Sequence, residues 1–305
     1  MPPRVCEEDA GIMDIPSNAI VVGISAEGSA AALEFAVAEA KRTSRPLHLV
    51  HVLMLPAGAA YADLCGDVRK DADVTLADAL AKAERLAGAG TDVTGEIASN
   101  GWTVDDLVRG STGHPLLVLQ HRALKGVHRL LAGSTVQSVA GRSHVPVVSV
   151  PENWVPRTGR PPLVTAAVQD AVEAPALLRA AFEAARGRSA SLVVLHAWWL
   201  ASGYDMVVVD GDFRAQWTDR SRTDIEPVLA PLRAEFPDVS VEVEVRHAPP
   251  VEAVLDAAEV SDLIVLGRRH HLLPLGSHLG PVARAALGHA TTPVLITPEL
   301  VPDLT

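Results

Sequence analysis

Three histidines lie close together near the end of the chain, in the stretch LGRRHHLLPLGSHLGP. His270, His271 and His278 stand among glycines, so the stretch could hold a metal ion or a phosphate group. A metal site needs about three ligands that converge on one point. Adjacent side chains on a loop seldom converge, and an equivalent stretch earlier in the chain has apolar residues at the same three positions. We therefore expect no metal site and favour a diverged phosphate loop.

That earlier stretch belongs to an internal repeat. Residues 116–151 align without a gap with residues 263–298 at an offset of 147, and PLHLVHVL upstream matches ASLVVLHAW, which pairs His51 with His196. The proline-containing interval between the copies is typical of a linker. The sequence predicts an N-terminal tail at 1–17, a first domain at 18–151, a linker at 152–161, a second domain at 162–298 and a C-terminal tail at 299–305.

The apolar pattern within each copy predicts the elements that must position these residues. Short runs rich in Val, Ile and Leu, such as AIVVGI and SLVVLHA, are separated by segments with helical spacing. A helix is expected over 29–42 with Ser29 as its N-cap, and a long helix over about 212–235. Doubly buried strands that alternate with helices indicate an α/β fold. We expect two tandem copies of a five-stranded, mainly parallel, doubly wound, Rossmann-like sheet with helices on both faces.

Bulk composition excludes several partners. The net charge of −11 argues against nucleic acid and against an anionic membrane, because both need a basic face. Two cysteines, Cys6 and Cys65, suit a reducing compartment and support no disulfide framework. The sequence starts without a basic and apolar leader, and no apolar run reaches the roughly 18 residues of a membrane span. We expect a cytoplasmic protein.

Ligands of such sheets bind beyond the carboxyl ends of the strands, where the strand order reverses. A helix that begins there can hold a phosphate with its first backbone N–H groups. The residues at these places are similar to those of the universal stress protein family in its tandem form. The similarity covers about residues 18–150 and 162–298, and rests on IVVGI, on LLVLQHR with GS and RSHVPVVSVP, and on LIVLGRR with GP and HATTPVLITP.

The resemblance implies a place for ATP. Members that bind ATP show Gly-x2-Gly-x9-Gly-Ser/Thr after the fourth strand and usually an Asp at the end of the first. In this chain the four motif positions carry Gln120, Ala123, Gly133 and Ser134 in the first copy, and Gly267, His270, Gly280 and Pro281 in the second. The Asp position is Ser25 in the first copy, and either Gln169 or Asp170 in the second.

The motif keeps its spacing but has lost part of its chemistry. In the first copy Gly133 and Ser134, followed by Thr135, can still accept an anion at a helix start. In the second copy Pro281 offers neither a hydroxyl nor an N–H, although Arg268 and a protonated His270 could hold a phosphate by charge. We expect at most weak binding of ATP, with Mg²⁺ entering only together with ATP.

Other polar and aromatic residues have structural readings that compete with functional ones. His51 and His196 are expected to cap the ends of their strands, with a ligand contact as the alternative. The carboxylates of the short helices, Asp105 and Asp106 among them, are expected to face solvent. Trp198 and Trp199 are expected to pack within their own loop, with a pocket mouth or a subunit contact as the alternatives.

These features predict a stress-response binding or regulatory module with no robust catalytic activity, at most a very slow ATPase. By resemblance, the last strands of the two copies would pair within the chain as a pseudo-dimer, two chains could associate as a homodimer, and the protein partner is unknown. One alternative is a nucleotide-hydrolysing or nucleotidyl-transfer enzyme, with Asp170 and either Asp210 or Asp212 holding a metal. Another is a scaffold without any ligand.

Overall fold

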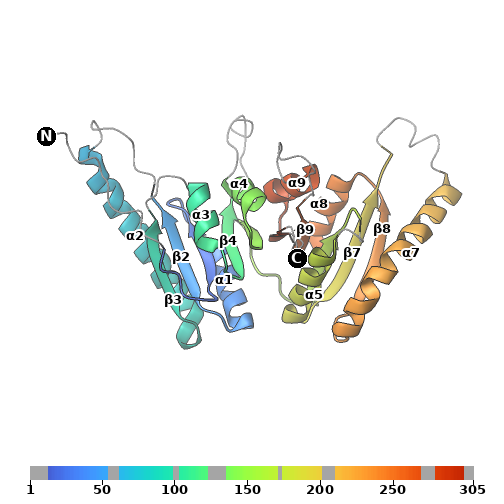
Figure 1. The fold of residues 1–305 in the computed structure, drawn as a ribbon, viewed down its shortest axis with the longest axis horizontal. Helices are drawn as coiled ribbons and strands as arrows, with labels where there is room; N and C mark the ends of the chain where they lie inside the picture. The colour runs from blue at the N-terminus through green and yellow to red at the C-terminus, as the bar shows by residue number, and fades with distance from the viewer. Residues whose placement is uncertain are drawn as a thin grey trace, which may run out of the picture. The chain divides into compact units, whose positions relative to one another are not determined.

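The chain divides between Asn153 and Trp154 into two compact units, coloured blue to green and green to red in Figure 1. This computed structural model describes residues 13–53, 62–98, 103–122, 135–170, 174–200, 210–268 and 279–298. The domain and linker boundaries expected from the sequence stay a prediction. Arg160 pairs with Asp262 at 3.0 Å, and Arg157 donates to the carbonyl of Ala258 at 3.2 Å. The segment 157–160, which precedes β6 (Leu163–Ala167), is therefore anchored to the second unit.

The first unit is a five-stranded parallel sheet with the strand order β3-β2-β1-β4-β5. Helices α1 and α2 pack together on one face, and helices α3 and α4 pack together on the other (Figure 1). The elements in chain order are β1 (Ile20–Ile24), α1 (Ala30–Thr43), β2 (Leu47–Val52), α2 (Ala62–Ala87), β3 (Val93–Ala98), α3 (Thr103–Ser111), β4 (Leu116–His121), α4 (Thr135–Arg142) and β5 (Val147–Pro151).

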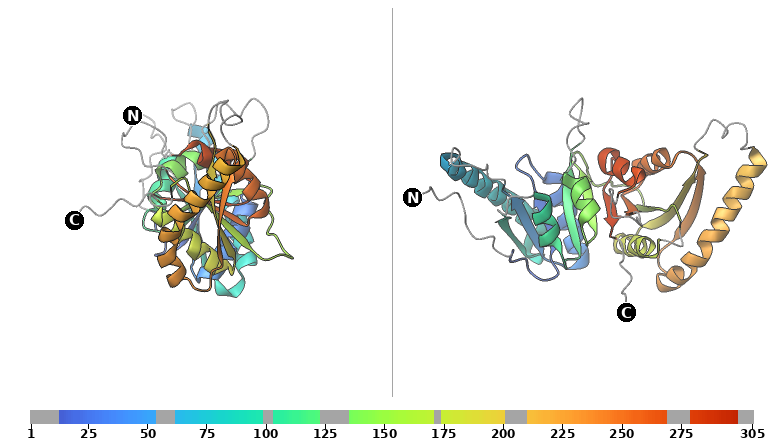
Figure 2. Two further views of the ribbon diagram at one scale, coloured as in Figure 1. Left: turned by 90° about the vertical axis from the view of Figure 1, so that its right-hand side faces the viewer. Right: turned by 45° about the horizontal axis from the view of Figure 1, so that its top comes forward.

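The second unit repeats this arrangement, with the order β8-β7-β6-β9-β10 and all neighbours parallel. Helices α5 and α7 contact one another, as do α8 and α9; both further views show these helices around the strands (Figure 2). Its elements are β6 (Leu163–Ala167), α5 (Pro175–Arg188), β7 (Ser191–Trp198), α7 (Gly211–Glu235), β8 (Val241–His247), α8 (Pro250–Val260), β9 (Leu263–Gly267), α9 (Pro281–His289) and β10 (Val294–Thr297).

The fold class expected from the sequence is confirmed, because both sheets are parallel and carry helices on both faces. The central strands read as continuous apolar runs because helices cover them on both sides. Phe182 and Phe236 are both fully buried in the second unit. They contact one another, with ring centroids 5.4 Å apart. Small and branched aliphatic side chains make up most of the remaining core.

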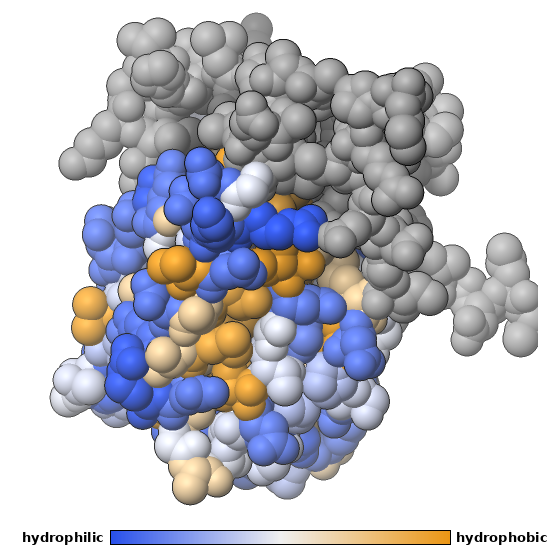
Figure 3. Space-filling view, turned by 90° about the vertical axis from the view of Figure 1, so that its left-hand side faces the viewer, coloured by the Kyte–Doolittle hydropathy of each residue, from blue (hydrophilic) through white to orange (hydrophobic). Residues whose placement is uncertain are grey.

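The first unit presents a mixed surface where β3 forms the edge of its sheet. Apolar patches run between polar side chains on this side of the molecule (Figure 3). Among the described large apolar side chains of this unit, Val74 of α2 is notably exposed, at 60%. Over the described part of the chain, none of the helices combines the length and the apolar character that crossing a bilayer requires.

Candidate functional site at the carboxyl ends of the strands

The strand order of the first unit reverses between β1 and β4, since β2 and β3 lie to one side of this pair and β5 to the other. The carboxyl ends of these two strands therefore flank the crevice where doubly wound sheets bind ligands. Ser25 follows β1, and Gln120 is the penultimate residue of β4. The structure thus brings these two predicted residues to the same crevice.

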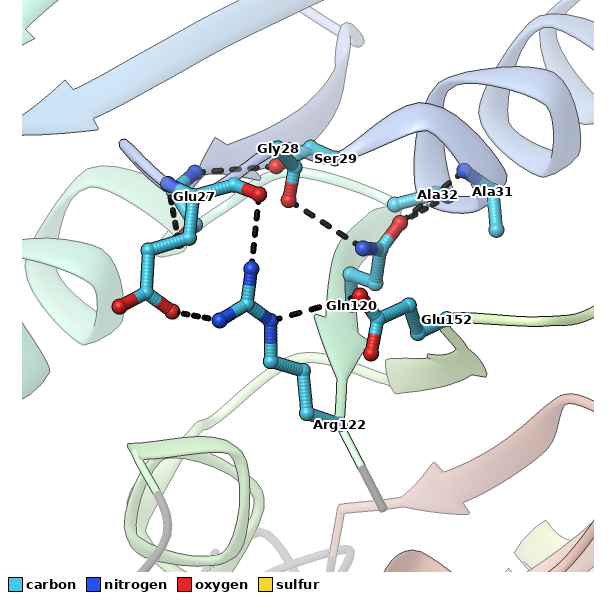
Figure 4. A network of polar contacts seen from close by, with 9 residues as sticks. Glu27, Gly28, Ser29, Ala31, Ala32, Gln120, Arg122 and Glu152 are labelled. Carbon is cyan, nitrogen blue, oxygen red and sulfur yellow. Dashed lines mark hydrogen bonds and ion pairs between the residues drawn. The ribbon is translucent and has the colours of Figure 1, made fainter. Parts of the chain in front are cut away.

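The Gln120 side chain closes the inner part of this crevice (Figure 4). Its Oε1 accepts hydrogen bonds from the backbone N–H groups of Ala31 and Ala32 at 3.0 and 3.3 Å, and its Nε2 donates to the carbonyl of Gly28 at 3.2 Å. The first N–H groups of a helix have no partner within the helix. Gln120 therefore caps α1 from a neighbouring strand and occupies the groups that could otherwise bind an anion.

Ser29 has a different role from the one expected. It occupies the N-cap position of α1, but its side chain makes no capping hydrogen bond. Its Oγ instead accepts from the backbone N–H of Ser25 at 2.9 Å. The expectation that the Ser29 hydroxyl caps the helix is wrong, because Gln120 already satisfies the N–H groups that the hydroxyl would reach.

Arg122 lies at the same strand end, two residues beyond Gln120, and contacts the β1–α1 turn (Figure 4). Its guanidinium pairs with the Glu27 carboxylate, donates to the Glu27 carbonyl at 2.7 Å and lies 3.6 Å from a carboxylate oxygen of Glu152. Glu27 belongs to a turn in which its N–H donates to Ser25 Oγ at 3.2 Å and Gly28 has a φ of +107°, a backbone conformation that favours glycine. The β1–α1 turn is therefore tied to the end of β4 by Gln120 and by Arg122.

The second unit fills the corresponding place in another way. Gly267 stands at the position of Gln120, and a Cβ added to it would lie 3.2 Å from Cδ1 of Leu177. Leu177 is 5% exposed and takes the place of Ala32 in the helix that follows the first strand. A large polar residue beside a small one in the first unit is thus exchanged for a glycine beside a leucine in the second.

The strand-end histidines settle the alignment between the two first strands. His51 Nδ1 lies 2.9 Å from the carbonyl oxygen of Ile24, and His196 Nδ1 lies 3.2 Å from that of Val168. Since a carbonyl oxygen only accepts, Nδ1 carries the proton in both rings. Ile24 and Val168 are therefore equivalent, which makes Gln169 the counterpart of Ser25 and places Asp170 one residue beyond. Both histidines bond backbone at the strand ends, in agreement with their structural reading.

The remaining predicted residues are only partly covered by the structure. Ala123, Gly133, Ser134 and His270 lie outside the described residues. Thr135 begins α4 and is exposed, Arg268 directly follows β9 and is half-buried, and Gly280 is the N-cap of α9 with Pro281 as its first residue. Within the described ranges, no three histidine, cysteine or acidic side chains gather as metal ligands would.

Two expectations about carboxylates and tryptophans need correction. Asp106 is fully buried rather than solvated, because α3 turns it inward; Arg109 lies 3.4 Å from its Oδ1, and neither oxygen accepts a hydrogen bond from the described residues. Its counterpart in the second unit is Ala253, also fully buried. Trp198 is the last residue of β7 and is buried at 7% exposure against Trp217 of α7 and His247 of β8, whereas Trp199 is 40% exposed. Burial is thus found for one of the two, and it comes from contacts with other elements.

Glu27, Arg122 and Glu152 were not singled out from the sequence. Arg122 follows the motif position of Gln120 by two residues, but its partners stand 95 and 30 positions away. One signal was present in the aligned copies. Gln120 with Ala32 and Gly267 with Leu177 exchange a large and a small residue between the same two positions, which is the pattern expected of side chains that share one space.

The repeated five-stranded parallel sheet, with helices on both faces of each copy, defines a tandem α/β protein with a Rossmann-like fold. Residues 17–151 and 164–298 each match the universal stress protein family. The chain therefore belongs to this family, as the residues at its strand ends predict.

Related proteins agree with this assignment. A universal stress protein of Mycobacterium tuberculosis is 29% identical over 220 residues, which covers 69% of this chain and 67% of that protein. One from Mycolicibacterium smegmatis is 26% identical over 291 residues, which covers 91% and 96% of the two chains. The crystal structure of a universal stress protein from Archaeoglobus fulgidus shares the fold with a TM-score of 0.67 at 16% identity, covering 92% of this chain and 96% of that one.

Proposed function

We propose that this tandem universal stress protein is a regulatory binding module that takes up an adenine nucleotide at the carboxyl edge of its first unit. The nucleotide enters in exchange for the contacts that close the crevice. The observation that carries the proposal is the position of Arg122, whose guanidinium lies at this strand end between two carboxylates. The protein partner through which such a module would act, and the association of the two copies or of two chains, stay predictions.

Arg122 can exchange a carboxylate for a phosphate at little cost. Its side chain is 37% exposed, while those of Glu27 and Glu152 are 66% and 42% exposed. Ion pairs this exposed contribute only about 0–1 kcal/mol to stability. A guanidinium binds phosphate with the same two-pronged geometry that it uses for carboxylates. A phosphate at this place would also lie near the start of α1, where the helix dipole favours negative charge.

The positions of the acidic residues that an ATP-hydrolysing enzyme would need support a binding function rather than a catalytic one. Hydrolysis of ATP requires a carboxylate that holds the metal and a group that orients water. Asp210, one of the candidates, instead accepts a hydrogen bond from the backbone N–H of Phe213 at 2.8 Å and so caps α7. Asp170 does not occupy the position equivalent to Ser25. The enzyme alternative predicts ATP turnover that is lost in Asp170→Ala.

A thermal-shift titration with ATP and Mg²⁺ tests the proposal. Ligand at 100 times its Kd stabilises the folded state by about 2.7 kcal/mol, so wild type should show a clear rise in the Tm of one transition. Arg122→Gln should abolish the rise, because the phosphate loses its cation. Arg142→Gln is the matched control, since it removes an exposed arginine of the same unit that pairs with Asp105. No rise in wild type at millimolar ATP, or an unchanged rise in Arg122→Gln, would overturn the proposal.

A further inference from the structure

Aromatic side chains gather at the carboxyl edge of the second unit, away from β6 and β9. Phe, Trp and Tyr make up only 4% of the sequence, yet four of them lie here with a histidine. We call this group the aromatic cluster; its members are Trp198, Trp199, Phe213, Trp217 and His247. It joins the last residues of the neighbouring strands β7 and β8 to the first two turns of α7.

The rings contact one another in a chain. Trp198 and His247 are paired in register at the ends of β7 and β8, with ring centroids 4.2 Å apart. Trp199 stacks on His247, with ring centroids 5.0 Å apart. Phe213 and Trp217 are one helical turn apart on α7, and their centroids lie 6.1 and 5.4 Å from that of Trp198. Trp198 is thus the central ring, in contact with three others.

The centre of the cluster holds a hydrogen-bond donor that none of the described residues uses. Trp198 is 7% exposed, and its buried Nε1 has no acceptor among the described residues. A buried donor without a partner costs about 1–3 kcal/mol, so tryptophans in such places normally have one. The two outer rings are by contrast accessible, since Trp199 is 40% exposed and Trp217 is 38% exposed.

The surroundings favour a small ligand over a protein. In α7, residues 211–224 include no buried side chain, and beyond the cluster this half of the helix is strongly charged, as Arg214, Asp219, Arg220, Arg222 and Asp224 show. A stable protein interface needs about 800 Å² per partner and is depleted of charge at its centre. The two exposed rings, Trp199 and Trp217, are surrounded by charged side chains. They are large enough for a planar ligand to stack on, but too small an apolar area for a stable protein interface.

We propose that the aromatic cluster is a binding site for a planar heteroaromatic ligand with a hydrogen-bond acceptor, such as a ring carbonyl or ring nitrogen. The ligand stacks on Trp199 or Trp217 and accepts a hydrogen bond from Trp198 Nε1. This site belongs to the second unit alone, because the first unit has Leu53 at the position of Trp198. It is independent of the nucleotide crevice of the first unit, so the two proposals can fail separately.

Riboflavin is a suitable probe, since it is planar, uncharged and carries ring carbonyls, and its fluorescence is quenched when it stacks on tryptophan. Titration of riboflavin with the full chain should give saturable quenching. Whichever of Trp199→Ala and Trp217→Ala removes the stacking ring should weaken binding roughly 5- to 150-fold, because stacking of a base on an aromatic ring contributes about 1–3 kcal/mol. Trp154→Phe is the control that removes a tryptophan outside the cluster, and Arg122→Gln should leave the quenching unchanged.

Trp198→Phe separates the binding role from a structural one. It keeps an aromatic ring but removes the donor, so the riboflavin affinity should fall, while any change in Tm reports the smaller ring as well as the lost N–H. Unchanged riboflavin affinity would mean that the ligand does not bond this N–H, and the proposal would be wrong. Quenching that does not saturate, or that survives both alanine variants, would also overturn it. So would concentration-dependent association of the chain that Trp199→Ala abolishes without affecting quenching, since the rings would then cover a protein interface.

Discussion

At the carboxyl edges of their sheets, the two units fill the same space between strand and helix with different residues. In the first unit Gln120 reaches over Ala32 and bonds the start of α1, while in the second Leu177 of α5 covers Gly267. Cores accept such exchanges when the total volume is kept. The comparison teaches that a retained motif glycine does not by itself leave a crevice open, because the second unit keeps Gly267 and fills the space above it with a leucine. In the first unit, by contrast, the space is filled by the Gln120 amide, and a polar ligand could take over the hydrogen bonds that this amide makes.

The largest expected effect comes from removing the apolar filling of the second unit. Leu177→Ala should lower the free energy of unfolding of this unit by about 2–5 kcal/mol, because Leu177 is buried and Gly267 has no side chain to fill the cavity. Chemical denaturation combined with hydrogen exchange would assign the loss to the second unit.

The converse change sharpens this comparison in the first unit. Ala32→Leu should destabilise the first unit by about 1–3 kcal/mol through overpacking against Gln120, and Gln120→Gly in the same chain should restore most of the loss. If the double variant is no better than Ala32→Leu alone, the two positions do not share one space.

A second difference between the units concerns Asp106 and its counterpart Ala253. Both are fully buried, but only the first unit buries a carboxylate, which makes no hydrogen bond with the described residues. Asp106→Ala should therefore stabilise the first unit by about 1–3 kcal/mol, as measured by denaturation. Asp105→Ala, an exposed neighbour in the same helix, should change stability by about 0.5 kcal/mol or less. Destabilisation by Asp106→Ala would show that the buried carboxylate has a partner that supports the fold.

The smallest effect is a difference in pH dependence. Burial lowers the pKa of His48 below its usual value of 6.5; the nearby Glu96 and Asp14 oppose this shift, and His114 adds to it. Because the unfolded chain then binds the proton more strongly, the stability that neutral His48 contributes is complete above about pH 6.5 and is lost as the pH falls further. The second unit has Val193 at this position.

Thermal unfolding between pH 7.5 and 5.5 measures this effect. The transition of the first unit should shift downward more than that of the second, and His48→Val should reduce the difference. An equal shift of the first transition in wild type and in His48→Val would contradict the assignment to His48.

Sequence reasoning predicted the fold because its signals are local. The apolar strands and helices such as 212–235 follow from short-range patterns, and α7 begins and ends within one residue of that range. The repeat follows from comparing two stretches of the sequence directly. The site was harder to predict from the sequence, because its key contacts join residues about 90 positions apart, such as Gln120 and Ala31. A glutamine in a glycine position shows that a motif is lost. It does not show that the amide will cap the helix that follows a neighbouring strand. Nor does the sequence show that the side chain of Asp106 will turn inward.

The measurement that tests the central claim most directly is the affinity for ATP with Mg²⁺ of Gln120→Gly against that of wild type, by isothermal titration calorimetry. If the Gln120 amide closes the crevice and must leave before a nucleotide enters, its removal should tighten binding by up to about tenfold, the equivalent of roughly 1.4 kcal/mol. That gain reflects hydrogen bonds to α1 that no longer need to be broken. Equal or weaker binding by Gln120→Gly would contradict the claim that this side chain holds the place of a ligand.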